Sequence, residues 1–170
     1  MVTYFITDPK YPLEKIFEAI KKHSPTFVCY RNKDYFDENE IIEFAKFTSN
    51  YSTPIINFDS LKNTGLLKYF KGIHFPSSKL HLINNFQNLI TIASTHSKEE
   101  VKKAKNADFI TFSPIFESKN RKGLGVEILN EIRLLHKNVI ALGGIISDKE
   151  VKKIKNTKAI GFGSIRYFLT

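Results

Sequence analysis

The chain has 170 residues, 42% of them hydrophobic and 13% aromatic, which is enough to bury one substantial core, and we expect a single domain over residues 1–170. The formal net charge of +9 comes largely from lysine runs on expected helix surfaces, and no nucleic-acid-binding motif accompanies it, so it predicts attraction of small anions rather than specific nucleic-acid binding. The single cysteine, Cys29, excludes an internal disulfide and a cysteine-rich metal site. The sequence has no long apolar run and no basic signal-like start, which predicts a soluble cytoplasmic protein without a membrane partner.

The first half of the chain alternates between β-rich runs and helical patterns. Pro12 stands where a first-turn proline is tolerated, and it precedes an i, i+3, i+4, i+7 stripe of Leu13, Ile16, Phe17 and Ile20. We expect strands at residues 2–7, 26–30, 54–58, 72–75 and 89–93. Helices are expected at residues 13–20, 40–47 and, weakened by Gly65, 61–70, whereas residues 76–86 are too irregular to assign.

The second half contains an internal repeat, in which residues 97–110 (SKEEVKKAKNADFI) resemble residues 147–160 (SDKEVKKIKNTKAI). Each copy opens with a Ser-x-x-Glu capping box, where the serine oxygen and the glutamate satisfy N–H groups of the first helical turn. Each copy therefore predicts a helix, a turn and a strand. Convergence on a common lysine-rich capped helix explains this repeat as well as duplication does.

The remaining elements complete an alternating order. Strands are expected at residues 107–112, 138–142 and 158–162, and between the first two lies a helical stripe of Ile128, Leu129, Ile132 and Leu135. Strict alternation of strand and helix predicts an α/β fold with a parallel sheet, and eight strands favour closure into a (β/α)8 TIM barrel over an open sheet. Such barrels usually have at least about 200 residues, so this one is expected to be compact and shortened, with its last helix nearly absent. A trimmed barrel exposes apolar flanks, which predicts a homo-oligomer.

Glycines and polar residues follow several of the expected strands. The strand at 138–142 runs into Gly143-Gly144, and the strand at 158–162 runs into Gly163-Ser164. Because the carboxyl ends of parallel strands share one face, these glycines let a phosphate approach backbone N–H groups, and the last two strands of a (β/α)8 barrel often hold one. A tight-turn role is the alternative. The strand at 107–112 leads into a cationic, hydroxyl-bearing loop that contains Ser118, Lys119 and Arg121, which is either an anion-facing loop or a solvated one.

Taken in order, these segments resemble the thiamine phosphate synthase and TenI-like barrels of thiamine biosynthesis. The resemblance covers nearly the whole chain: YFITD, YRNK, PIIN, GIHF, STH, ADFITFSPIFESKNRKGLG, IALGGI and GFGSI. It implies a phosphorylated small-molecule substrate, a thiazole phosphate or a related metabolite.

In the synthase branch, the resemblance implies transfer between a pyrimidine diphosphate and a thiazole phosphate, with magnesium held by two aspartates. Phe58 stands at the first aspartate position and Lys79 is near the second, while Asp59 is one residue late and would point to the other face if the strand continued. Arg31 and Lys33 match positions that hold the diphosphate, and Asn57 is also retained.

In the TenI-like branch, the resemblance implies a thiazole tautomerase in which the residue matched by His96 moves a proton without metal. Histidine suits this chemistry because its ordinary pKa is near 6.5. We therefore expect a tautomerase with no cofactor. A divergent synthase that uses Asp59 or substrate-bound magnesium is the second hypothesis, and a non-catalytic phosphometabolite-binding or regulatory protein is the third.

The candidate site follows from these hypotheses, with His96 as the catalytic residue, although His96 could merely precede the Ser97 cap. Phosphate is expected at Gly143, Gly144, Gly163, Ser164 and Ser118. Other substrate contacts are expected from Arg31, Lys33, Asn57, His74, Ser94, Arg121 and Arg166. For Arg166 the sequence leaves two roles open, a phosphate contact or a block of the pocket. We expect His23, His81 and His136 at the surface and Cys29 as a small buried residue.

Overall fold

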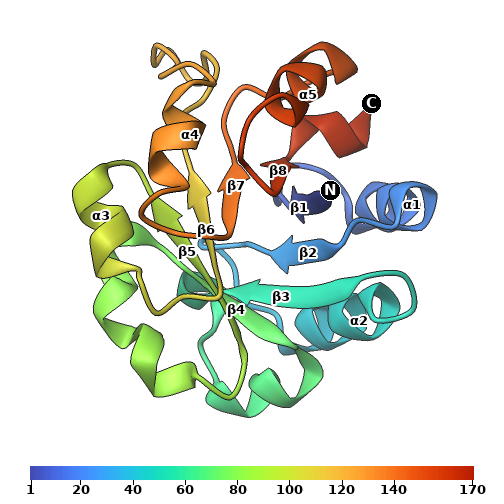
Figure 1. Ribbon diagram of the computed structural model, residues 1–170. Coiled ribbons are helices and arrows are strands. Elements are labelled where there is room, and N and C mark those ends of the chain that lie inside the picture. Colours follow the sequence, from blue (N-terminus) through green and yellow to red (C-terminus); the bar gives the residue numbers. More distant parts are fainter.

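The computed structural model describes residues 1–170 and shows a closed barrel of eight parallel strands (Figure 1). The strands pair in sequence order, and β8 pairs with β1 through Tyr4 opposite Gly163 to close the ring. The expected (β/α)8 fold is confirmed. The strands are β1 Val2–Ile6, β2 Phe27–Tyr30, β3 Thr53–Asn57, β4 Gly72–Phe75, β5 Ile90–Thr95, β6 Phe109–Phe112, β7 Val139–Ala141 and β8 Gly161–Ser164.

Helices form the outer ring, but several are shorter or tighter than the sequence predicts. The α-helices are α1 Leu13–His23, α2 Glu38–Thr48, α3 Lys98–Lys103, α4 Ile128–Ile132 and α5 Asp148–Lys155. Four 3-10 helices fill the other connections: η1 Phe58–Ser60, η2 Thr64–Tyr69, η3 Ser77–Phe86 and η4 Arg166–Leu169. The helix expected at 61–70 is thus a 3-10 segment, and the eighth helix is reduced to η4, which packs against α1. None of the helices combines the length and the hydropathy needed to cross a membrane.

The capped repeat forms helices in both copies, with one difference between them. In α5 the box is complete, since the Ser147 oxygen accepts a backbone N–H of the first turn and Glu150 accepts the Ser147 N–H at 2.9 Å. In α3 the Ser97 oxygen accepts the Glu100 N–H at 3.1 Å, but the Glu100 carboxylate accepts the N–H of His96 instead. The box expected at Ser97 is therefore only half formed, and Glu100 is held against the end of β5.

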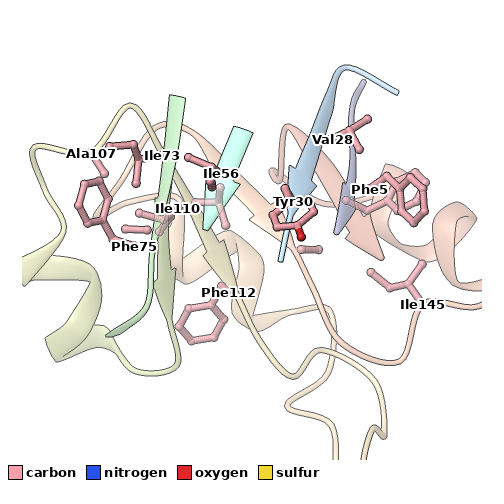
Figure 2. Packing of buried hydrophobic residues seen from close by; sticks show 14 of the residues in the cluster. Phe5, Val28, Tyr30, Ile56, Ile73, Phe75, Ala107, Ile110, Phe112 and Ile145 are labelled. Carbon is pink, nitrogen blue, oxygen red and sulfur yellow. The ribbon is translucent and has the colours of Figure 1, made fainter. Parts of the chain in front are cut away.

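Alternation along the strands divides the core into two layers. One set faces the helices and includes Phe5, Ile56 and Phe112 (Figure 2). The other set fills the barrel and consists of Tyr4, Ile6, Phe27, Cys29, Ile55, Ile92 and Ile140. Cys29 is 0% exposed, so the expectation of a small buried residue is confirmed. The period of two continues toward the mouth of the barrel, so that polar side chains such as Asn57, His74 and Ser94 follow on the inner face.

Two expectations were wrong for identifiable reasons. β8 begins at Gly161 rather than at residue 158, because a turn at Thr157 diverts the chain and Gly161 lies where any Cβ would be 1.9 Å from the Val2 carbonyl oxygen. Gly163 and Ser164 thus lie within the strand, not after it. His136 is 7% exposed rather than at the surface, since its Nε2 donates to the Ala107 carbonyl and its Nδ1 accepts the Asn138 N–H. This histidine ties the starts of β6 and β7 together, and burial lowers its pKa.

Candidate functional site

The mouth of the barrel is the rim formed by the carboxyl ends of the strands. Registers such as Thr95 opposite Phe112 and Phe112 opposite Ala141 bring the ends of β5, β6 and β7 to the same level. His96 therefore follows β5 on the same rim where Gly143 follows β7, two strands away. His96 and the Gly143-Gly144 turn therefore lie on the same rim of the barrel, not on opposite ones.

Gly143 and Gly144 turn the chain sharply at the end of β7. Their φ angles are +100° and +69°, a region that other residues rarely adopt. The loop after β6 passes directly against them, because a Cβ on Gly143 would lie 2.7 Å from Pro114 Cα and one on Gly144 would lie 2.5 Å from the Glu117 carbonyl oxygen. The amides of both glycines donate to no group of the chain. The tight-turn and anion-binding interpretations are therefore compatible: the turn is built around glycine, and its N–H groups are available.

The neighbouring end of β8 adds further unpaired amides but no free hydroxyl. Ser164 is buried, and its Oγ donates to the Ile145 carbonyl at 2.6 Å and accepts the Tyr167 N–H at 3.1 Å. Its only hydroxyl proton is thus already used, and the serine ties β8 to the β7 turn. Beyond it, the amides of Ile165 and Arg166 donate to no group of the chain. A phosphate at this end of the barrel would be bound by backbone N–H groups rather than by the Ser164 hydroxyl.

His96 is exposed at the rim and is oriented by a carboxylate. Its Nδ1 lies 3.1 Å from Oε1 of Glu100, which also accepts the His96 backbone N–H at 2.8 Å. With Nδ1–H donated to Glu100, Nε2 is the free nitrogen of the ring and makes no hydrogen bond within the chain. An imidazole held in this way can remove and return a proton at Nε2.

His74 occupies the inner face of β4 as part of a buried hydrogen-bonded chain. Its Nδ1 lies 2.7 Å from Tyr4 Oη and its Nε2 lies 2.6 Å from Ser94 Oγ. Burial, together with the nearby charges of Arg31 and Lys33, lowers the pKa of His74 to about 3. His74 and Ser94, both expected as substrate contacts, are therefore directly bonded, and only Ser94 retains partial exposure toward the mouth.

The ends of β2 and β3 form a second polar group at the rim. Lys33 Nζ lies 3.2 Å from Asp59 Oδ2, whereas the Arg31 guanidinium makes no ion pair within the chain. Asn57 is 6% exposed, and its Oδ1 accepts the Asp59 N–H. That bond ends β3 and starts η1, so the strand does not continue and Asp59 faces Lys33. The expectation that Asp59 would point to the other face applied only to a strand that continued, and β3 ends at Asn57.

The residues at the two positions that the resemblance matches to magnesium-binding aspartates do not fit a divalent cation. The Phe58 ring stacks on Phe75 with centroids 5.7 Å apart and also contacts Phe86, so this position belongs to the apolar packing. Lys79 lies in η3 and brings a cation instead of a carboxylate. No three His, Cys, Asp or Glu side chains cluster as a metal site would require. Asp59, the carboxylate that follows β3, is already paired with Lys33.

The cationic loop after β6 ends in a small exposed hairpin. Ser118 and Arg121 exchange backbone hydrogen bonds of 3.1 and 2.9 Å, and the intervening Lys119 and Asn120 have φ of 51° and 61°. Lys119 and Arg121 are exposed, and neither makes an ion pair within the chain. Arg166 likewise carries its side chain on the surface at the start of η4.

Sequence reasoning missed two side chains that shape the site. Glu100 was interpreted only as a helix cap, although the i, i+4 spacing from His96 is a signal that the two meet on one helix face. Tyr4 was interpreted only as part of a β-rich run. No local pattern reveals its bond to His74, because 70 residues separate them and closure of the barrel brings them together.

Comparisons with known proteins agree with this architecture. The family model described as Thiamine monophosphate synthase (TMP-TENI) matches residues 3–167. The chain is 32% identical to "Putative thiamine-phosphate synthase 2" of Aquifex aeolicus over 98% of this chain and 96% of that protein, and 25% identical to "Thiamine-phosphate synthase" of Clostridium tetani over 92% and 80%.

Among solved structures, thiamine phosphate pyrophosphorylase from Pyrococcus furiosus superposes with a TM-score of 0.78 at 22% identity, covering 96% of this chain and 85% of that one. Phosphoribosyl anthranilate isomerase from Thermotoga maritima, at 10% identity, shares the fold with a TM-score of 0.68, covering 98% and 89%. Because the family model spans nearly the whole chain and the Aquifex relative does as well, the chain belongs to the thiamine monophosphate synthase family.

Proposed function

We propose that this protein binds a thiazole phosphate at the mouth of the barrel and moves a proton within its ring through His96. The observation that carries the proposal is the pairing of His96 with Glu100 on the rim that also carries the unpaired amides after β7 and β8. Those amides supply partial positive charge for the phosphate, and Nε2 of His96 supplies a proton acceptor and donor. The phosphate would hold the ring while the imidazole acts on it.

The chemistry needs only groups that the chain provides. As a base, Nε2 takes a proton from one ring position, and the C–H electron pair is delocalised into the ring. The imidazolium formed is stabilised by the Glu100 carboxylate at Nδ1. The same Nε2–H then returns the proton to another position, so that atoms and charge balance and His96 is regenerated.

The direct test is aromatisation of the unconjugated thiazole phosphate tautomer by the purified protein. We expect acceleration by the wild type, its loss in His96→Ala, and unchanged binding of the aromatic thiazole phosphate in that variant. His81→Ala is the matched control, because His81 is an exposed histidine on η3. If the wild type gives no acceleration over buffer, the tautomerase proposal is refuted.

A second candidate is a divergent thiamine phosphate synthase, which the names of the curated relatives favour. Arg31, Lys33 and Asn57 at the rim support binding of a diphosphate. Against it stand Phe58 and Lys79 at the magnesium positions. Its test is release of pyrophosphate from a pyrimidine diphosphate and a thiazole phosphate with magnesium present. Ligand binding without turnover in either assay would instead favour the non-catalytic binding protein.

A further inference from the structure

Three side chains from β1, β4 and β5 form a hydrogen-bonded chain from the centre of the barrel to its mouth. Tyr4 is 0% exposed and bonds His74, which is 3% exposed and bonds Ser94. The tyrosine and imidazole rings also stack, with centroids 5.6 Å apart and planes inclined by 23°. Ser94 is the partly exposed end of this chain. Each bond has a direction, and the direction of the first bond determines the others.

At Tyr4, burial decides the direction. His74 Nδ1, 2.7 Å away, is the strong hydrogen-bond partner of Tyr4 Oη, and the buried Cys29 thiol is a second, weak one. If Oη accepted a proton from Nδ1, its own buried proton would have only the weakly accepting sulfur of Cys29, which is unfavourable. Burial also raises the pKa of Tyr4 well above its ordinary value, so the hydroxyl keeps its proton. Tyr4 therefore donates to Nδ1.

At His74, the single ring proton must then lie on Nε2. Burial and the positive charges of Arg31 and Lys33 keep the imidazole neutral, with one N–H. Since Nδ1 accepts from Tyr4, Nε2 donates to Ser94 Oγ at 2.6 Å. The Ser94 oxygen is thereby used as an acceptor, and its own proton has no acceptor within the chain.

We propose that Tyr4 and His74 act as positioning residues that turn the Ser94 hydroxyl proton toward the mouth. The site then selects ligands that present an unprotonated acceptor at this point, either a ring nitrogen or a carboxylate oxygen. The direction of the hydrogen bonds is independent of the reaction. Only the selection of the ligand rests on the proposed function, through the assumption that a thiazole phosphate occupies the mouth.

The direction is tested by nitrogen NMR of protein labelled at histidine. In the wild type His74 should be the Nε2–H tautomer at pH 7, with the Nδ1 resonance shifted by the bond that it accepts, and Tyr4→Phe, which removes one oxygen, should move that resonance toward the value of a nitrogen without a hydrogen bond. Tyr30→Phe is the matched control, because Tyr30 donates to Glu40 outside the barrel. An Nδ1–H tautomer in the wild type, or an unchanged Nδ1 resonance in Tyr4→Phe, overturns the proposal.

The selection is tested by calorimetric binding of two probes, thiazole phosphate and its N-methylthiazolium analogue, in which the acceptor nitrogen is blocked. The wild type should bind the first about tenfold more tightly, as expected for one hydrogen bond from a positioned donor. Ser94→Ala should reduce that ratio several-fold, and Tyr4→Phe should reduce it partly. An equal ratio in wild type and Ser94→Ala overturns the selection. Failure of the tautomerase assay would leave both readouts in place, so the two proposals fail separately.

Discussion

Acid should destabilise the barrel through His74, and the size of the effect follows from its burial. In the folded protein the pKa of His74 is lowered from 6.5 to about 3. The unfolded chain therefore binds a proton below pH 6.5 that the folded protein does not bind. The contribution of neutral His74 to the free energy of unfolding is fully present above pH 6.5 and is lost as the pH falls toward 3. The loss is about 1.4 kcal/mol per pH unit, so that acidification to pH 4.5 costs about 2.7 kcal/mol from this group.

The assay is urea unfolding followed by far-ultraviolet circular dichroism, because the chain has no tryptophan. The free energy of unfolding is measured from pH 7.5 to 4.5 in the wild type and in His74→Gln, whose amide can bond to one of the two neighbours. Other groups also contribute, since burial lowers the pKa of His136 as well. The prediction therefore concerns the difference between the wild type and His74→Gln. Below pH 6.5 the free energy of unfolding of the variant should depend less steeply on pH, by nearly one bound proton.

Two results would refute this reasoning. The first is an identical acid slope in wild type and His74→Gln. The second uses the wild type and so does not depend on whether the variant folds. We expect the nitrogen shifts of His74 in the folded wild type to show no protonation down to pH 4.5, and protonation above that pH would refute the reasoning. Titration of His74 near its ordinary pKa would mean that the ring is not enclosed between Tyr4 and Ser94 as described.

Other substitutions test the packing and the rim. Gly144→Ala should destabilise the protein by about 2 kcal/mol or more and weaken binding of thiazole phosphate, because φ is +69° and the new Cβ would meet backbone; thermal unfolding and calorimetry would measure both effects. Phe58→Asp should cost about 2 kcal/mol in urea unfolding through lost aromatic contacts, and a stable variant would show that the ring is not part of the core. Asp59→Asn should change the free energy of unfolding by less than about 1 kcal/mol, because the Asp59 and Lys33 side chains of this ion pair are 31% and 42% exposed, respectively. Leu134→Ser should leave the melting temperature of the monomer nearly unchanged, because Leu134 is 87% exposed.

The order of elements could be predicted because it depends on local patterns. The apolar stripe of α1, the Ser147 cap and the short β-rich runs each involve neighbouring residues, and their alternation is enough to predict a parallel barrel. One error arose where distant backbone decides, because the start of β8 depends on the approach of Gly161 to Val2. Another was local: the end of β3 depends on the Asn57 side chain, which accepts the N–H of Asp59 two residues later and starts η1.

The features of the candidate site also divide into those that the sequence predicts and those that the tertiary structure decides. From sequence alone, the glycines after β7 could be identified by residue type and position, whereas His96 and the replaced carboxylates at Phe58 and Lys79 could be identified only through the resemblance to a known family. The tertiary structure decided which groups are free: it commits the Ser164 hydroxyl to Ile145, pairs Asp59 with Lys33 and joins Tyr4 to His74. Hydrogen bonds between strands far apart in sequence form only when the barrel closes, and burial then shifts the pKa values of the groups that they join.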